Sequence, residues 1–208
     1  IFETIDEPVE VKDAKDAIEM PAIQGKLEFE HVTFSYEKGV EILKDVNFSV
    51  EPGKTIAFVG PTGAGKSTIV NLISRFYNVD SGRILIDGVD ISKVTLRSLR
   101  KQMGVMMQDS FIFGGTIMDN IRYGNKTATD EEVIRAAKTV CAHDFIMQME
   151  DGYQTQVNER GSRLSVGQRQ LISFARALLA DPAILILDEA TSSIDTRTER
   201  LVQEGMDR

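Results

Sequence analysis

The sequence predicts an α/β fold, and two features of its pattern indicate this. Short β-branched and aliphatic runs, TIAFV at 55–59 and ILIL at 184–187, are typical of strands. They occur together with segments whose apolar residues recur at helical spacing, such as the one that follows Ser67. The chain has 208 residues, 42% of them hydrophobic and 27% charged, so one sizeable core is expected and disorder is not.

In chain order, the first elements favour an antiparallel β region. The runs LEFEHVTFSY at 27–36 and VNFSV at 46–50 alternate as strands do, and EPGK at 51–54 is interpreted as a turn. RILIDG at 83–88 is expected to be a further strand, which ends in a turn at the Asp-Gly pair. His31 interrupts the alternation of the first run, so we interpret it as a strand or bulge residue.

From 116 to 179 the period of the apolar residues becomes helical. Thr129 and Glu132 have the spacing of a capping box, which predicts a helix start there. His143 lies in a polar stretch that is expected to open another helix. The last predicted helix has an apolar face made of Leu171, Ala175 and Leu178.

A glycine-rich segment, GPTGAGKST, joins the run at 55–59 to a helical pattern and matches the GxxxxGKS phosphate loop. Its glycines let the backbone curl so that successive N–H groups face one anion, and Lys66 adds a positive charge. A loop between strand and helix also places the phosphate at the positive end of the helix dipole. The residues predicted to bind a nucleotide phosphate are Gly60, Pro61, Thr62, Gly63, Ala64, Gly65, Lys66, Ser67 and Thr68.

Two adjacent carboxylates, Asp188 and Glu189, follow the run at 184–187. This run is expected to be a buried strand whose C-terminal end delivers both acids to the phosphates. Acids at a strand end often merely face water, so the pair gains a functional meaning only from the phosphate loop. With that loop, Asp188 is placed to hold Mg²⁺ together with the Ser67 hydroxyl, and Glu189 to polarise an attacking water. The sequence therefore predicts nucleotide hydrolysis.

A third motif, LSVGQ at 164–168, stands between the other two. In this order, the three motifs resemble the nucleotide-binding domain of an ATP-binding cassette (ABC) transporter of the exporter type, over residues 25–208. The resemblance implies a RecA-like P-loop NTPase core with an antiparallel β region and an α-helical subdomain at about 109–179. It also implies that residues 1–24 are a connector from a transmembrane domain.

The resemblance assigns ligands and roles as well. ATP would be the nucleotide and Mg²⁺ its metal ion. Tyr36 would stack on adenine, and Gln108 would be the Q-loop glutamine near Mg²⁺ and the water. Ser165 and Gly167, grouped with Gln168, would contact the γ-phosphate of ATP held by a second cassette. NERG at 158–161, with Glu159, is similar to a loop that senses transmembrane domains, and SSID at 192–195 resembles the D-loop. The catalytic set is Glu189, Gln108 and Lys66, and the metal set is Ser67, Gln108 and Asp188.

Some of these residues have alternative structural roles. Tyr36 shares a strand face with Phe34 and could be packed in the core. Ser165 could be a helix N-cap that forms a capping box with Gln168, and such a helix start would also offer its positive end to a phosphate. Val166 replaces the glycine usual at the third signature position, which a negative φ in a first helical turn would permit.

The family's switch histidine has no counterpart, because His31 and His143 both precede Asp195. We expect from this a chain that is cut from a longer exporter before the switch histidine. The net charge of −8 argues against a nucleic-acid surface, and the single Cys141 fits a reducing compartment. No apolar run approaches the ~20 residues of a membrane span, so the piece itself is expected to be soluble.

The resemblance implies a domain that hydrolyses ATP to power export, through ATP-driven dimerisation of two cassettes. Its partners would be a second cassette, identical or different, and the transmembrane domains of the same transporter, at the cytoplasmic face of the plasma membrane. One alternative is a soluble ABC ATPase that acts on DNA or ribosomes, against which the connector and NERG argue. The other is a non-hydrolysing regulatory module, which the intact Glu189 argues against.

Overall fold

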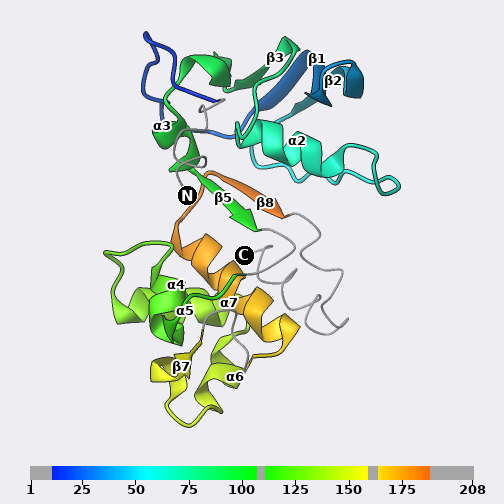
Figure 1. Ribbon diagram of the computed structural model, residues 1–208. Coiled ribbons are helices and arrows are strands. Elements are labelled where there is room, and N and C mark those ends of the chain that lie inside the picture. Colours follow the sequence, from blue (N-terminus) through cyan, green and yellow to red (C-terminus); the bar gives the residue numbers. More distant parts are fainter. Residues whose placement is uncertain (1–10, 107–110, 159–163, 188–208) are drawn as a thin grey trace, which may run out of the picture. The chain divides into compact units, whose positions relative to one another are not determined.

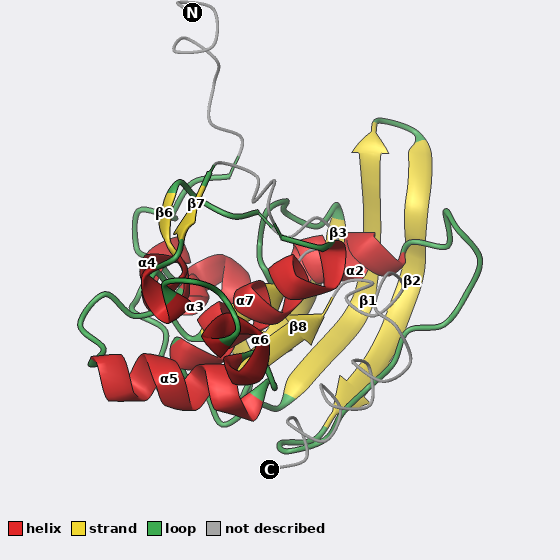
Figure 2. Ribbon diagram, turned by 90° about the horizontal axis from the view of Figure 1, so that it is seen from below, coloured by secondary structure: helices red, strands yellow, loops and turns green. Residues whose placement is uncertain are grey.

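The computed structural model describes residues 11–106, 111–158 and 164–187 (Figure 1). The chain divides into two compact units, Ile1–Met103 and Gly104–Arg208. Both α-helices and β-strands occur in each unit, in agreement with the predicted α/β class (Figure 2).

The first unit contains a four-stranded antiparallel sheet with the order β2-β1-β3-β4. The strands are β1 (Leu27–Glu37), β2 (Val40–Val50), β3 (Ser81–Ile86) and β4 (Val89–Asp90). On β1, Phe29, Val32 and Phe34 are buried, as expected of the core face of a strand. The register of β1 against β2 shifts between Phe29 and Val32, and His31 between them has φ 52°. The prediction of a bulge at His31 is therefore confirmed.

A two-residue turn connects β3 to β4. Asp87 and Gly88 both have positive φ, 51° and 77°, which the tight hairpin turn requires. The Asp87 carboxylate accepts the backbone N–H of Gln24 and Lys26 at 2.6 and 2.9 Å. The predicted strand closed by Asp-Gly is confirmed, and its aspartate also fixes the start of β1.

The prediction of a strand at 55–59 is wrong for this structure, because the segment is irregular. Ile56 is 43% exposed and Val59 is 94% exposed. A β-branched run forms a strand only where a neighbouring strand supplies hydrogen bonds, and no described strand pairs with this segment. The predicted turn at 51–54 is present, with Lys54 N–H donating to Glu51 O at 3.2 Å.

Helix α2 (Lys66–Ile73) follows the glycine-rich loop, as predicted. Ile69, Leu72 and Ile73 are buried, and the helix lies against β1 and β2 (Figure 2). The helical pattern in the sequence continued to Phe76 and Tyr77, but the helix ends before them. Arg75 has φ 50°, a left-handed conformation that stops the helix.

Residues 11–24 are bound to the 3₁₀ helix η1 (Ile91–Lys93) and the helix α3 (Leu96–Arg100). Ile18 N–H donates to Lys93 O at 3.0 Å, and Thr95 N–H donates to Ile18 O at 2.8 Å. Met20 N–H donates to the Ser98 hydroxyl at 2.8 Å. This segment is therefore docked on the first unit over several residues; its assignment as a connector stays a prediction.

The second unit is mainly helical. Its helices are α4 (Ile117–Arg122), α5 (Asp130–Thr139), α6 (His143–Met147) and α7 (Val166–Leu179), with a 3₁₀ turn η2 (Gly152–Gln154). Its strands pair as β6 (Gly115–Thr116) with β7 (Gln156–Val157), and as β5 (Met103–Met106), which begins at the last residue of the first unit, with β8 (Ile184–Leu187).

Three local predictions are confirmed in this unit. Thr129 and Glu132 form the capping box of α5. His143 is the first residue of α6. The apolar face of α7 enters one core with α4, α5 and α6, since Leu171 and Ala175 are buried there and Leu178 packs against them. The run at 184–187 is a strand, as predicted, but only Ile186 in it is buried, and its other residues are partly exposed.

Candidate nucleotide site

The phosphate loop has the backbone geometry that its glycines were predicted to provide. Gly63 and Gly65 both have φ 84°, and Gly65 is the N-cap of α2. A Cβ at Gly65 would lie 2.8 Å from Leu43 Cδ2, so a side chain is disfavoured by the conformation and would also require the buried Leu43 to shift. Ala64 N–H donates to Pro61 O at 3.1 Å, which closes the turn.

Lys66 extends over this loop. Its Nζ donates to the carbonyl oxygens of Gly60 and Pro61 at 2.8 and 3.0 Å, at an exposed position. These are neutral acceptors, and a phosphate oxygen would be a stronger acceptor for an ammonium group. The amine is therefore held at the mouth of the loop by contacts that an anion can replace.

Tyr36 lies on β1 beside α2 and is not a core residue. The residue is 46% exposed, whereas Phe34 is 3% exposed, so the core interpretation of Tyr36 is wrong. The Tyr36 hydroxyl donates to Thr68 Oγ1 at 3.2 Å, and the rings of Phe34 and Tyr77 meet it edge-on at 4.8 and 5.0 Å. These contacts hold a half-exposed aromatic ring next to the phosphate-loop helix. Adenine stacking at Tyr36 stays a prediction.

The signature segment begins helix α7 through a capping box, as predicted. Ser165 Oγ accepts Gln168 N–H at 3.1 Å, and Gln168 Oε1 accepts Ser165 N–H at 2.9 Å. Val166 is the first helical residue and 48% exposed, so the helix accommodates valine there. A Cβ at Gly167 would meet only Ser165 Oγ, at 4.0 Å, so space remains above the backbone.

The strands β5 and β8 end next to the remaining predicted residues. Figure 1 draws their arrows in the same direction, so the chain leaves both paired strands at one edge. Gln108 follows β5 by two residues and Asp188 follows β8 directly. Gln108, Glu159, Asp188, Glu189 and the SSID motif lie outside the described residues.

Carboxylates are distributed unevenly over the helix N-termini of the described chain. Acids occupy the first turns of α4, α5 and α6, and the N-terminal Leu96 N–H of α3 donates to the Asp13 carboxylate at 2.8 Å. The first turns of α2 and α7 contain no acid. A helix N-terminus attracts negative charge, so among the described α-helices α2 and α7 are the two at which no described carboxylate meets this attraction.

A buried polar network in the second unit was not predicted from the sequence. The Asn120 amide donates to the carbonyls of Phe113 and Thr116, while its Oδ1 accepts Phe113 N–H and Arg176 Nη2. Arg176 also donates to the carbonyls of Asn120 and Phe111, and burial lowers the pKa of Arg176. The network thus ties the segment after Met106 to α7. Its sequence signal was weak, because Asn120 and Arg176 are far apart in the chain.

An exposed aromatic cluster lies beside this network. Phe111 is 51%, Phe113 37% and Tyr123 54% exposed. Their rings are in sequential contact, with centroids 5.0 Å apart for the first pair and 4.6 Å for the second. The Arg176 guanidinium lies 5.1 Å from the Phe113 ring centroid. Such a contiguous aromatic surface on a helical unit is typical of a protein-binding site.

The sequence pattern of the family described as "ABC transporter" matches residues 43–192, a stretch that contains the phosphate loop, the signature segment and both acids. This chain belongs to the ABC transporter family. Family membership confirms two predictions: the P-loop NTPase fold class and an ABC-type ATPase domain that binds ATP.

Two curated relatives are similar over almost the whole chain. The "uncharacterized ABC transporter ATP-binding protein YfiC" of Bacillus subtilis (strain 168) is 54% identical over 208 residues, which are 100% of this chain and 34% of that protein. A "fatty acid ABC transporter ATP-binding/permease protein" of Mycobacterium bovis is 50% identical over 206 residues, 99% of this chain and 32% of that protein. The chain therefore spans about a third of the length of these relatives.

A solved structure of a bacterial Atm1-family ABC exporter with ATP bound is also similar. It superposes with a TM-score of 0.94 at 45% identity and covers 99% of this chain and 36% of the exporter chain. Among the described residues, none of the helices is both long and apolar enough to cross a membrane.

Proposed function

We propose that this ATPase domain powers export across a membrane, through ATP-driven association of two such domains. The observation that carries the proposal is the pair of acid-free helix N-termini, at the phosphate loop of α2 and at the signature of α7. The triphosphate of one ATP can be contacted from two sides: one domain would bind it at Lys66, and a second would approach its γ-phosphate with Ser165 and Gly167. The similarity to exporters supports this use of the two sites.

On this proposal, the residues of the chain have separate tasks. Tyr36 supports the adenine ring, and the phosphate-loop N–H groups orient the β- and γ-phosphates. Lys66 changes its acceptors from two loop carbonyls to phosphate oxygens and stabilises the charge on the transferred phosphoryl group. Glu189 orients the attacking water for in-line attack and accepts its proton.

Magnesium is the metal ion that fits the proposed donor set. Ser67, Gln108 and Asp188 offer a hydroxyl, an amide and a carboxylate oxygen, and Mg²⁺ prefers oxygen ligands. Among these, Ser67 is in the first turn of α2, at the phosphate loop. When bound, Mg²⁺ would neutralise charge on the phosphate oxygens.

The transmembrane domains of the same transporter are the proposed partner of the aromatic cluster Phe111, Phe113 and Tyr123. Two observations support this: the cluster is exposed on a helical unit, and the Mycobacterium bovis relative is an ATP-binding/permease protein about three times as long as this chain. The domain would then work at the cytoplasmic face of the membrane. The second cassette would be either a copy of this chain or a different one.

The test is a comparison of Glu189→Gln with Glu150→Gln, a change at an exposed glutamate that belongs to none of the motifs. In a complete cassette, Mg-ATP should convert Glu189→Gln into a dimer detected by light scattering, because the water activator is lost while the phosphate contacts remain. Glu150→Gln should behave as the parent chain does. If Glu189→Gln hydrolysed ATP at the parent rate, its role as the base would be wrong.

A further outcome separates the alternatives. Dimerisation with ATP that is insensitive to Ser165→Ala would argue against the signature as the second phosphate contact. If the parent chain bound ATP but did not hydrolyse it, even together with a second cassette and the transmembrane domains, a regulatory module would be favoured. Stimulation of hydrolysis by DNA or ribosomes would favour a soluble ABC ATPase.

A further inference from the structure

The C-terminus of α2 ends in a Schellman motif with an arginine where glycine is usual. Arg75 N–H donates to Leu72 O at 3.0 Å and Phe76 N–H donates to Asn71 O at 2.9 Å, the two bonds that define the motif. Arg75 is the left-handed residue of this motif, with φ 50°. A residue with a Cβ is strained in that conformation, whereas glycine is not. The contacts of the arginine side chain can offset part of this strain.

Those contacts join α2 to the N-terminal segment. Arg75 is 4% exposed; its Nη1 donates to Val94 O at 2.7 Å and its Nη2 donates to Lys12 O at 3.1 Å. Val94 is in turn bridged to Ile18. One guanidinium at the end of the phosphate-loop helix thus binds both the N-terminal segment, through Lys12, and the segment on which it is docked, through Val94.

A second arginine strengthens the same helix end. Arg100, the last residue of α3, donates from Nε to Ser74 O at 3.0 Å and from Nη2 to Arg75 O at 2.8 Å. Its guanidinium also lies 4.8 Å from the Phe76 ring centroid. The carbonyls at the negative end of α2 are therefore bound by a cation from α3, and α2 and α3 are linked.

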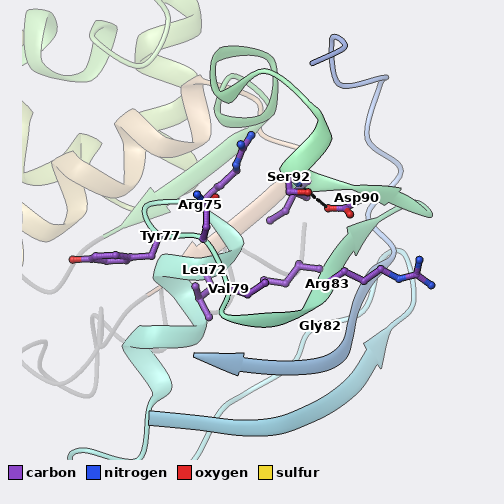
Figure 3. A pocket seen from close by; sticks show the side chains of 11 residues that line it. Leu72, Arg75, Tyr77, Val79, Gly82, Arg83, Asp90 and Ser92 are labelled. Atoms are coloured by element: carbon purple, nitrogen blue, oxygen red, sulfur yellow. Dashed lines mark hydrogen bonds between the residues drawn. The ribbon is translucent and has the colours of Figure 1, made fainter. Parts of the chain in front are cut away.

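A pocket of about 290 Å³ adjoins Arg75. Figure 3 shows Leu72 and Arg75, at the end of α2, on one wall, and Gly82 and Arg83 of β3 on another. No described group accepts a hydrogen bond from Arg75 Nε. The helix end thus has free space on the side of β3 and directional bonds on the side of residues 11–24. The hydrogen bonds of the Arg75 guanidinium to described residues go to Val94 and Lys12, so this side chain links the helix end to that segment and not to β3.

We propose that Arg75 is a positioning residue that couples occupation of the phosphate loop, at one end of α2, to the docking of residues 11–24 at the other end. The inference rests on the proposed function, because it takes ATP as the ligand of the phosphate loop. Residues 11–24 are then one route, besides the aromatic cluster, by which the nucleotide state of the cassette reaches its transmembrane domain.

Hydrogen exchange of residues 11–24, measured by mass spectrometry with and without Mg-ATP, tests the coupling. Coupling free energies between sites usually correspond to about 5- to 150-fold effects, so ATP should slow this exchange by at least about fivefold in the parent chain. Arg75→Gly should still bind ATP by calorimetry, since glycine suits the left-handed position, but its residues 11–24 should not respond. Arg75→Lys should respond partially, because an ammonium cannot bridge two carbonyls as a guanidinium does.

Asp181→Gly is the matched control. Asp181 also follows a helix, α7, in a left-handed conformation with φ 49°, and its side chain is exposed. This variant should respond to ATP as the parent does. The proposal is overturned if the parent binds ATP without a change in residues 11–24, if Arg75→Gly keeps the response, or if Arg75→Gly loses ATP binding while folded. Absence of ATP binding by the parent would instead refute the proposed function.

Discussion

Gly63 and Gly65 provide a controlled test of how the phosphate loop is built. Both have φ 84°, so alanine at either position suffers the same left-handed penalty of about 1–2 kcal/mol. Their surroundings differ: a Cβ at Gly63 would meet nothing within 4 Å, whereas one at Gly65 would lie 2.8 Å from Leu43 Cδ2. Leu43 is buried at 4% exposure and cannot move freely.

The steric difference sets the expected magnitudes. Overpacking of a core typically costs about 1–3 kcal/mol, so Gly65→Ala should lower the free energy of unfolding by about 2–5 kcal/mol and Gly63→Ala by about 1–2 kcal/mol. For a chain of this size, 1 kcal/mol corresponds to about 2–4 °C in Tm. Urea unfolding of both variants measures the gap, and calorimetry should show that Gly65→Ala weakens ATP binding because the N-cap of α2 is displaced.

A double-mutant cycle identifies the cause. Leu43→Ala alone should destabilise by about 2–5 kcal/mol, as large-to-small core changes do. In the Gly65→Ala background its effect should be smaller by about 1–3 kcal/mol, because the new Cβ then has space. Equal losses for Gly63→Ala and Gly65→Ala, or an additive cycle, would refute the contact between the loop and β2 as the reason for glycine.

Further predictions concern single side chains. Lys66→Ala should abolish ATP binding measurable by calorimetry without a change in circular dichroism, because among the described residues Lys66 Nζ donates to two carbonyls of the exposed loop. Retained micromolar affinity would contradict the phosphate-loop assignment. Arg176→Gln should lower the free energy of unfolding by about 2–4 kcal/mol, because three oxygen atoms lose a charged hydrogen-bond donor. As a control, Arg135→Gln at an exposed position should change it by less than about 0.5 kcal/mol. Val166→Glu should stabilise α7 by about 0.3–1 kcal/mol through the helix dipole and weaken ATP-dependent dimerisation; stronger dimerisation would exclude the signature as an anion site. Hydrogen bonds from Thr116 lower the pKa of Asp119, so its contribution to stability is present above the unfolded carboxyl pKa and is lost as the pH falls through the folded value. In Asp119→Asn, the free energy of unfolding should therefore fall less steeply as the pH decreases below about 4. An unchanged pH dependence would refute this role.

Local features of the fold could be predicted because their causes are local. The capping box of Ser165 and Gln168 and the Asp87-Gly88 turn each depend on two residues close in sequence. The phosphate loop was predictable for the same reason, since its shape follows from glycines within one short segment.

Features that depend on distant partners could not be predicted. The run at 55–59 has strand composition but no described strand beside it, and pairing is a property of the whole sheet. The end of α2 was misplaced because the left-handed residue is Arg75, where the sequence signal would have been glycine. The hydrogen bond between Leu96 N–H, at the N-terminus of α3, and the Asp13 carboxylate joins residues that are 83 positions apart in the sequence. The spacing of apolar residues contains no information about such a contact.

The uneven placement of carboxylates also explains how a chain with a net charge of −8 can bind the polyanion ATP. Repulsion between exposed charges is screened beyond about 8 Å at physiological ionic strength, so groups within that distance of the phosphates dominate. At α2 and α7 the helix ends are capped by neutral devices, a left-handed glycine and a serine–glutamine capping box, which order the backbone without adding negative charge. An acid in either first turn would stabilise the helix and at the same time compete with phosphate for the same N–H groups. The helices that carry such acids, α4, α5 and α6, are therefore the ones whose N-termini need no external ligand.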